Sequence, residues 1–307
     1  MKVRKAVITA AGWGTRFLPA TKAQPKEMLP LLNKPIIQYA VEEAIASGIE
    51  QIIIVTAMGK HSVEDHFDRC FELEYVLQQK GMLEALREVS TIGNSSRIYY
   101  VRQREQLGLG HAVLTAQDFI DDEPFALLLP DDIIQSQVPV TKQLIDIFEQ
   151  HLCSVLAIEE VMAERIGSYG IIKPQQLDER LYQVLSLVEK PEIHCAPSNL
   201  GIVGRYVLTP DIFKVLRETP PGKGGEIQLT DGLNALLPKQ NILGYRFKGT
   251  RYDTGTPMGL LKASIAVALE SPKMAEELKE YLTGLRLFDN QTLATLNTKD
   301  PATIRKN

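Results

Sequence analysis

The chain begins with an apolar segment that runs directly into a glycine-containing loop, and this arrangement constrains its fold more than any other feature. Lys5 to Thr9 has the character of a buried strand, and the loop after it contains Gly12 and Gly14. A helical apolar pattern follows over Ile36 to Ser47, and a second apolar strand over Gln51 to Thr56. Strand, helix and strand in this order form a βαβ unit, which predicts a layered α/β domain with a mainly parallel sheet.

Strand-like and helix-like patterns alternate through the first half of the chain and then change character. Helices are expected over residues 62–79, 82–89 and 111–119, and strands over residues 97–102 and 125–129. Short strand-like runs with turns between them, typical of an antiparallel or mixed region, occupy residues 155–160, 170–173, 184–188 and 200–207. Further helices are expected over residues 211–218, 227–237, 258–269 and 273–285, and a strand over residues 242–247.

Together the patterns predict a Rossmann-like α/β fold, with a mixed, mainly parallel sheet flanked by helices, a smaller β-rich part and C-terminal helices. We expect one continuous domain over residues 1–265, with a division near residue 135, and a helical tail over residues 266–307. Beyond Asp289 the composition is polar and the periodicity is lost, so a frayed end is expected.

Composition excludes several classes of function. Lys and Arg number 34 against 38 Asp and Glu, a net charge of −4, which argues against non-specific binding to nucleic acid or to a membrane surface. No apolar stretch approaches transmembrane length, and the run from Ala6 to Ala11 is too short for a signal peptide. The three cysteines lie far apart, so neither a disulfide framework nor a zinc ribbon is expected. We expect a soluble, cytoplasmic protein.

The glycine loop is typical of a turn that binds phosphate. Gly12 and Gly14 permit positive φ and close backbone approach, so that N–H groups can surround an anion. Arg16, Lys22 and Lys26 lie close behind and form a local cationic cluster in an acidic protein. The prolines at positions 19, 25 and 30 are expected to keep this segment extended.

Two common nucleotide-binding patterns do not fit the loop. A dinucleotide fingerprint needs a third glycine at position 17, where the chain has phenylalanine, and a helix directly behind the loop. The Walker A pattern is also missing from the sequence. A hydride-transfer enzyme is therefore disfavoured.

The sequence from Ala10 to Pro30 closely resembles the signature of the sugar-1-phosphate nucleotidylyltransferases, in particular their bacterial branch of UTP–glucose-1-phosphate uridylyltransferases. Further similar blocks follow in the family's order at residues 33–39, 107–113, 188–191, 196–206 and 225–231. The resemblance covers the chain to about residue 265. It implies a nucleotidyltransferase fold with a nucleotide-binding part over about residues 1–135 and a sugar-binding part over about residues 136–265.

The implied reaction is attack by the phosphate of glucose 1-phosphate on the α-phosphorus of UTP, which gives UDP-glucose and pyrophosphate. The attacking phosphate is already an oxyanion at neutral pH, so no strong general base is needed. Catalysis then rests on in-line positioning and on neutralisation of the phosphate charges. The resemblance further implies a Mg²⁺ cofactor and a homo-oligomer, either a dimer or a tetramer.

A candidate metal site follows the strand over residues 125–129, at the edge where ligands bind in open α/β sheets. Mg²⁺ takes one or two carboxylates and completes its shell with phosphate and water oxygens. By resemblance Asp131 is the metal ligand and Asp253 its partner, whereas Asp132 supports the ribose or the surroundings of the site. An Asp-Asp pair by itself also fits a turn or a helix cap.

The resemblance assigns the other candidate residues to three groups. The catalytic group is Arg16, Lys26, Asp131, Lys190 and Asp253. The nucleotide-binding group is Ala11, Gly12, Gly14, Thr15, Glu27, Gln103, Gly108 and Asp132. The sugar-binding group is Gly170, Glu189, Lys190 and Asn199. The amide of Gln103 can both accept and donate, so it can read the N3–H and O4 edge of a pyrimidine.

Two alternatives remain open. The stretch from Asp253 to Thr256 equally resembles the glucose-1-phosphate thymidylyltransferases, and one methyl group in a pocket is worth only about 1–3 kcal/mol, so dTTP could replace UTP. A non-catalytic, nucleotide-sugar-binding regulatory protein could share the fold. Loss of Lys26, Asp131, Lys190 or Asp253 would favour the regulatory protein, and all four residues are present.

Overall fold

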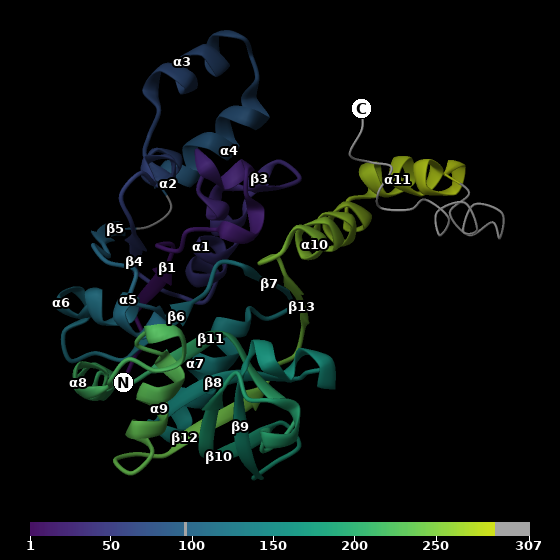
Figure 1. Cartoon of the computed structure of the whole chain (residues 1–307). Helices are drawn as coiled ribbons and strands as arrows, with labels where there is room; N and C mark the ends of the chain where they lie inside the picture. Colours follow the sequence, from purple (N-terminus) through teal and green to yellow (C-terminus); the bar gives the residue numbers. More distant parts are fainter. Residues whose placement is uncertain (95–96, 286–307) are drawn as a thin grey trace.

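The computed structural model describes residues 1–94 and 97–285 (Figure 1). Its centre is one nine-stranded sheet, mixed and flanked by helices as expected, with the strand order β5, β4, β1, β6, β11, β8, β12, β10, β9. The expectation that this sheet is mainly parallel is wrong, because among the described residues its antiparallel pairings are at least as numerous as its parallel ones. Residues 286–307 of the expected tail, with the expected frayed end beyond Asp289, lie outside the described residues.

One half of the sheet is parallel. β1 (Lys5–Thr9) lies between β4 (Gln51–Thr56) and β6 (Phe125–Leu128), and β5 (Arg97–Arg102) continues beside β4. β1, β4 and β6 are apolar and buried on both faces, which is the pattern of parallel strands covered by helices. Because parallel strands end at the same edge, the loops after β1, β5 and β6 emerge together.

The other half is mostly antiparallel, which confirms the expected change of character. It consists of β8 (Ser154–Glu160), β9 (Gly170–Gln176), β10 (Leu181–Glu189), β11 (Leu200–Leu208) and β12 (Ile242–Arg246). β11 joins the two halves, because it pairs antiparallel with both β6 and β8. Only β8 and β12 pair in parallel here.

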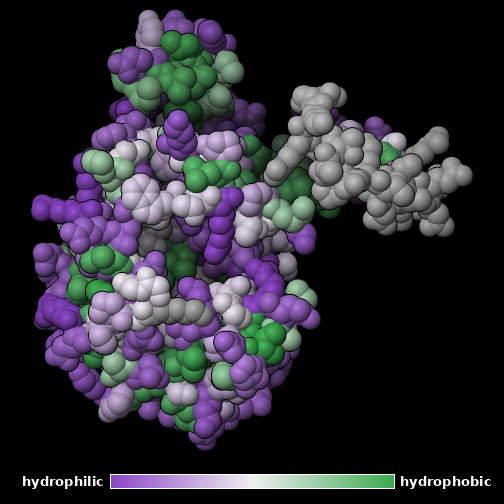
Figure 2. Space-filling view, viewed as in Figure 1, coloured by the Kyte–Doolittle hydropathy of each residue, from purple (hydrophilic) through white to green (hydrophobic). Residues whose placement is uncertain are grey.

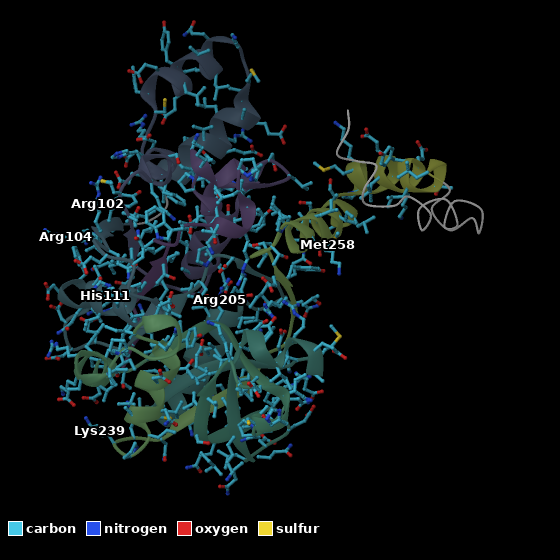
Figure 3. All side chains as sticks on the ribbon, in the orientation of Figure 1. Arg102, Arg104, His111, Arg205, Lys239 and Met258 are labelled. Atoms are coloured by element: carbon cyan, nitrogen blue, oxygen red, sulfur yellow. The ribbon has the colours of Figure 1, made fainter. Side chains whose placement is uncertain are left out.

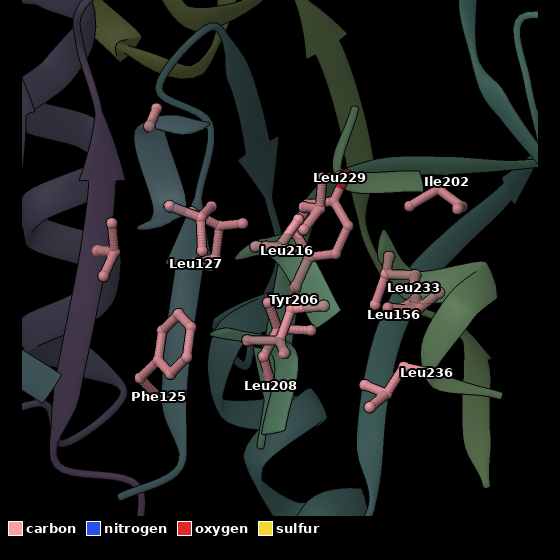
Figure 4. Packing of buried hydrophobic residues seen from close by; sticks show 14 of the residues in the cluster. Phe125, Leu127, Leu156, Ile202, Tyr206, Leu208, Leu216, Leu229, Leu233 and Leu236 are labelled. Carbon is pink, nitrogen blue, oxygen red and sulfur yellow. The ribbon is translucent and has the colours of Figure 1, made fainter. Parts of the chain in front are cut away.

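Helices cover both faces of the sheet. On one face, α1 (Ile36–Ala46) and α7 (Val140–His151) pack against side chains such as Ile8 and Ile54. On the other face, α5 (Leu109–Thr115), α8 (Asp211–Glu218) and α9 (Leu229–Leu236) pack against a cluster that includes Leu156 and Tyr206 (Figure 4). Successive residues of a strand point to opposite faces, so each strand supplies both cores.

Three expectations about local structure are wrong or incomplete. The helix expected over residues 62–79 is broken into α2 (His61–Phe67) and α3 (Phe71–Gln79), because the backbone of Asp68 is extended. α7 was not expected, although Val140, Leu144, Ile145 and Phe148 have helical spacing and are buried. The helix expected over residues 111–119 is two short helices, α5 and α6 (Gln117–Ile120).

The proline-containing segment after the glycine loop is not extended. It forms three 3-10 turns, η1 (Thr15–Phe17), η2 (Ala20–Lys22) and η3 (Lys26–Met28). Pro19 and Pro25 directly precede η2 and η3, since the fixed φ of proline suits the start of a turn as well as an extended chain. The segment closes with the short pair β2 (Pro30–Leu31) and β3 (Lys34–Pro35).

Two helical extensions project from the body in Figure 1. α3 and α4 (Leu83–Asn94) form one, and Figure 2 shows apolar side chains gathered at its tip. α10 (Pro257–Glu270) and α11 (Pro272–Gly284) form the other. In the part of the chain that the structure describes, no helix has both the length and the apolar character needed to cross a membrane.

Candidate active site

The glycine loop between β1 and η1 is fixed at both ends. The N–H of Ala10 donates to the carbonyl of Val55 at 2.7 Å, and the hydroxyl of Thr21 donates to the carbonyl of Gly14 at 2.8 Å. Gly14 has a φ of 65°, and a β-carbon there would lie 3.0 Å from the β-carbon of Lys26. Position 14 therefore favours glycine for both its conformation and its space.

The backbone of this loop is prepared for an anion. Among the described residues, no acceptor is paired with the N–H groups of Ala11 to Thr15. These residues line a pocket of about 410 Å³, together with Lys26 and Gln103. Consecutive N–H groups around a pocket, with a lysine beside them, are the arrangement that suits phosphate oxygens.

A buried carboxylate lies in the same pocket. Glu27, only 1% exposed, pairs through Oε2 with Lys60 at 2.8 Å, and its Oε1 is buried with no hydrogen-bond partner among the described residues. Burial raises the pKa of Glu27, although Lys60 and Lys26 oppose the shift. A buried acceptor without a partner is costly, so Oε1 is suited to accept a hydrogen bond from a ligand hydroxyl or N–H.

The opposite wall is formed after β5. Gln103 is buried, and its amide Nε2 lies 3.2 Å from the carbonyl of Gly108 and 2.9 Å from Nδ1 of His111, which Figure 3 labels. This leaves Oε1 of Gln103 as an acceptor. Gly108 has a φ of 97°, and a β-carbon there would lie 2.6 Å from Glu226, so the close approach of the two segments requires glycine.

Asp131 lies just beyond β6, where the sequence placed it. Its Oδ2 accepts a hydrogen bond from Nζ of Lys26 at 2.7 Å. Burial alone raises the pKa of Asp131, but Lys26 outweighs it and holds this pKa below the ordinary value. Burial likewise lowers the pKa of Lys26, but Asp131 and Glu27 outweigh it and raise this pKa. Both groups are therefore charged at neutral pH.

Asp253 is brought to Asp131 by a two-stranded ribbon that the sequence did not predict. In it, β13 (Thr250–Asp253) pairs antiparallel with β7 (Asp132–Gln135), and Asp253 lies opposite Asp132. Thr254, which is buried, donates from both its N–H and its hydroxyl to the carbonyl of Asp131, each at 2.8 Å. The two loops are thereby joined at the candidate metal ligands.

The two carboxylates converge on one point. A β-carbon added to Gly255 would lie 3.0 Å from Oδ1 of Asp253, 3.3 Å from Oδ2 of Asp131 and 3.4 Å from Arg16. No group of three or more acidic, histidine or cysteine side chains that could hold a metal occurs among the described residues. Two converging carboxylates with phosphate-binding groups beside them fit a hard divalent cation that takes its remaining ligands from phosphate and water.

A buried arginine holds the Asp131 loop from behind. Arg205 is 1% exposed and lies at the centre of the molecule in Figure 3. Its guanidinium donates to the carbonyls of Leu129 and Asp132, each at 2.8 Å, and to the carboxylate of Glu43 at 2.7 and 2.9 Å. The other oxygen of Glu43 accepts from the N–H and hydroxyl of Thr141 at the start of α7. The network fixes the backbone on both sides of Asp131.

Asp132 faces a second part of the cleft. Its Oδ2 accepts from the N–H of Gly204 at 2.9 Å, and its Oδ1 pairs with Arg251. Arg251 also donates to Glu159 and to the hydroxyl of Tyr169, both at 2.7 Å. Both oxygens of Asp132 thus have partners, and the residue lines the second pocket rather than the pocket of the glycine loop.

The second pocket, of about 360 Å³, is lined by three of the four candidate sugar residues, Gly170, Glu189 and Lys190. Glu189 ends β10, accepts from the hydroxyl of Thr230 at 2.6 Å and pairs with Nζ of Lys190 at 2.9 Å. Lys190 has a φ of 44°, and its N–H donates to the carbonyl of Tyr169 at 3.0 Å. A left-handed lysine is strained, and such strain is concentrated at functional sites. A β-carbon at Gly170 would lie 2.8 Å from the Thr230 hydroxyl and 3.3 Å from Oε2 of Glu189, so it would crowd both side chains.

The structure brings most of the predicted residues together. The two pockets share Leu109, Leu129, Asp131 and Glu226 as lining residues, so they form one cleft with Asp131 at the junction. Asn199 is exposed, does not line either pocket, and accepts through its backbone carbonyl from the N–H of Val161. Its role in binding stays a prediction.

Several residues of the cleft were not singled out from the sequence. Glu226 and Thr230 lie in a block that carries the resemblance, so their position in the motif was an available signal. Arg165, Tyr169 and Arg251 belong to no motif and enter the cleft through tertiary packing.

Comparisons with known proteins agree with this geometry. A family model described as "Nucleotidyl transferase" matches residues 5–270. The chain is 51% identical to a UTP–glucose-1-phosphate uridylyltransferase of Staphylococcus epidermidis over 284 residues, which is 92% of this chain and 99% of the relative. A UDP-glucose pyrophosphorylase solved in complex with UDP-glucose is 46% identical, with a TM-score of 0.81 over 87% of this chain and 99% of that one.

A protein named for the thymidylyltransferase alternative is a more distant match. A putative glucose-1-phosphate thymidylyltransferase from Bacillus anthracis is 22% identical, with a TM-score of 0.68 over 85% of this chain and 94% of that one. At this identity the likeness shows a shared fold alone.

Proposed function

The chain belongs to the nucleotidyl transferase family, and we propose that it transfers the uridylyl group of UTP to glucose 1-phosphate. The products are UDP-glucose and pyrophosphate. One observation carries the proposal: the pocket of the glycine loop and the pocket of Glu189 and Lys190 meet at Asp131. Near-full-length similarity to uridylyltransferases supports the choice of both substrates.

The reaction forms one phosphorus–oxygen bond and breaks another. An oxygen of the sugar phosphate attacks the α-phosphorus of UTP, and the bond to the oxygen bridging to the β-phosphorus breaks, with pyrophosphate leaving. The N–H groups of Ala11 to Thr15, with Lys26 and Arg16, bind the triphosphate. Lys190 binds the sugar phosphate, and Glu189 and Gly170 form the wall against the sugar. That the pockets meet at Asp131 supports this proposal, because ligands in the two pockets would bring the sugar phosphate next to the triphosphate, as in-line attack requires.

Gln103 favours uracil over cytosine. Its Nε2 has Gly108 and His111 as partners, which leaves Oε1 to accept a hydrogen bond from a base. Uracil presents an N3–H donor at the edge where cytosine presents an acceptor, so cytosine would leave two acceptors facing each other. Thymine presents the same N3–H, so Gln103 does not distinguish UTP from dTTP. That discrimination must come from the space around the C5 methyl group, from contacts to the ribose 2′-hydroxyl, or from both.

We assign the divalent cation to Asp131 and Asp253, and propose Mg²⁺ because its preferred ligands are carboxylate, phosphate and water oxygens. When bound, it would neutralise phosphate charge that develops during transfer. Arg16 and Lys26 supply further positive charge at the same junction.

The test is direct. Purified protein with MgCl₂, UTP and glucose 1-phosphate should release pyrophosphate and form UDP-glucose in equal amounts. Parallel reactions with dTTP, CTP and ATP compare the bases, and CTP should be the poorer pyrimidine substrate. Binding of UDP-glucose without pyrophosphate release would support a regulatory protein instead, and faster turnover of dTTP would support a thymidylyltransferase.

We also propose a homo-oligomer and the division of the domain near residue 135. Exposed apolar side chains on the α10–α11 extension, including Leu261, Met274 and Tyr281, support the oligomer. Light scattering after size-exclusion chromatography distinguishes a monomer, a dimer and a tetramer. Cytoplasmic location stays a prediction of the sequence.

A further inference from the structure

Both candidate metal ligands carry a basic partner in this structure. Lys26 pairs with Asp131 at 2.7 Å, and Arg165 pairs with Asp253 at 2.5 Å. Lys26 already has a place in the proposed site, whereas Arg165 belongs to no motif and has no role in it. Each of the two carboxylates is therefore neutralised by a basic side chain before any ligand is present.

Arg165 lies in the sugar pocket. It comes from η4 (Ala163–Ser168), between β8 and β9, and lines the same pocket as Lys190, Gly170 and Asp253. Its guanidinium lies over the ring of Tyr169, 5.5 Å from the ring centre. That ring belongs to the residue whose carbonyl accepts from the N–H of Lys190. One short segment therefore positions Arg165 and Lys190 on the same pocket.

The guanidinium of Arg165 retains donors for a ligand. An arginine carries five N–H donors, and among the described residues only the bond to Asp253 uses one of them. Its side chain is 44% exposed. Arg251 provides a contrast on the same Tyr169 ring: its side chain is 5% exposed and bonded to Asp132, Glu159 and Tyr169. Arg251 is thus part of the scaffold, whereas Arg165 faces the cleft.

We propose that Arg165 is a further binding residue for the phosphate of the sugar 1-phosphate. The proposal rests on the proposed function and extends it. A dianionic phosphate beside Asp131, Asp253 and Glu189 needs more positive charge than Lys190 alone supplies, and a guanidinium can bind two phosphate oxygens at once.

Because Arg165 pairs with Asp253, it would also couple the binding of the metal to the binding of the sugar phosphate. A divalent cation on Asp131 and Asp253 would compete with Arg165 for the carboxylate of Asp253. Arg165 would then leave Asp253 and bind the sugar phosphate instead. The positive charge of Arg165 would thus become available at the moment when the phosphate is bound. Metal and sugar phosphate should therefore bind cooperatively, and part of that coupling should depend on Arg165.

The experiment compares Arg165→Gln, Arg165→Lys and the wild type. A matched control is Arg217→Gln, which removes one positive charge from an exposed position on α8 that does not line the cleft. For Arg165→Gln, we expect the KM for glucose 1-phosphate to rise at least about tenfold and the KM for UTP to change less than about threefold. Arg165→Lys should be intermediate, because it keeps the charge and loses the two-oxygen contact.

Equilibrium binding gives a readout that does not depend on turnover. Calorimetry with UDP-glucose, with and without MgCl₂, should show tighter binding with the metal for the wild type and a smaller metal effect for Arg165→Gln. An unchanged KM for glucose 1-phosphate, an equal rise in both KM values, or an unchanged metal effect would each overturn the proposal. An inactive wild type would instead overturn the proposed function, so the two failures are distinguishable.

Discussion

Substitution of Gly255 by alanine should separate metal binding from folding. Gly255 is buried and lies between the candidate metal ligands, and the added methyl would stand 3.0 Å from Oδ1 of Asp253 and 3.3 Å from Oδ2 of Asp131. Its φ lies outside the left-handed region, so alanine brings no backbone strain. The contacts are with the ends of side chains, which can move by a few tenths of an ångström.

The substitution should cost little stability but much activity. Overpacking of this kind costs at most about 1–3 kcal/mol, and about 1 kcal/mol lowers the Tm of a domain of this order of size by about 2–4 °C. A divalent cation, in contrast, needs carboxylate oxygens at about 2.1 Å, and a methyl between them blocks that approach. Loss of about 3–4 kcal/mol of charge stabilisation in the transition state would lower kcat/KM by about 10²–10³-fold.

The assay is pyrophosphate release from UTP and glucose 1-phosphate over a range of MgCl₂ concentrations, with Tm measured on the same samples. We expect the Gly255→Ala variant to be folded, to need more Mg²⁺ for half-maximal rate, and to turn over slowly at saturation. The matched control is Gly284→Ala at the end of α11, where an added β-carbon meets nothing within 4 Å. A folded Gly255→Ala variant that stays within about threefold of the wild-type kcat/KM at limiting Mg²⁺ would refute the shared metal site.

Three further predictions follow from other parts of the structure. Asp131→Asn should lower turnover by about 10²–10³-fold with a Tm close to wild type, and a nearly fully active variant would remove Asp131 from the mechanism. Among the described residues, Arg205 makes five hydrogen bonds, to the carboxylate of Glu43 and to three backbone carbonyls, and Arg205→Lys keeps the charge but has only three donors. Urea unfolding of this variant should show a loss of about 2–5 kcal/mol in the free energy of unfolding. An unchanged free energy of unfolding would contradict a stabilising role for the network. Cys153 is buried, and burial raises the pKa of its thiol. A thiol reagent at pH 8 should therefore label the exposed Cys70 and Cys195 first, and Cys153 only on unfolding. Equally fast labelling of all three thiols would show that Cys153 is accessible.

The sequence alone could predict the glycine loop and the strands around it. β1 and β4 are recognisable as short apolar runs, and α1 is recognisable by the helical spacing of its apolar residues. These patterns are local, because the side chains that an element buries recur at a fixed spacing along its own sequence. The order of the motifs identified the family, and Asp131 could be placed at the edge of the sheet because it directly follows an apolar strand. α7 also has a readable helical period, in Val140, Leu144, Ile145 and Phe148, so this helix was predictable from the sequence alone.

The ribbon of β7 and β13 could not be predicted in the same way. Each strand has only four residues, and each is stabilised by pairing with a segment far away in the sequence. The break between α2 and α3 and the turns after the prolines likewise depend on what the chain packs against, since proline fixes φ but allows both turn and extended conformations.

The chemical groups that this protein brings to its site can therefore be read from the chain, because glycines, lysines and aspartates of this kind are recognisable in their local context. The pairing of those groups depends on how the chain folds. Lys26 on Asp131, Arg165 on Asp253 and Arg205 behind the loop are contacts between distant segments. Burial and neighbouring charge set the pKa values of Lys26 and Asp131, and the pairing decides which groups are free to bind a ligand; no local pattern records either property.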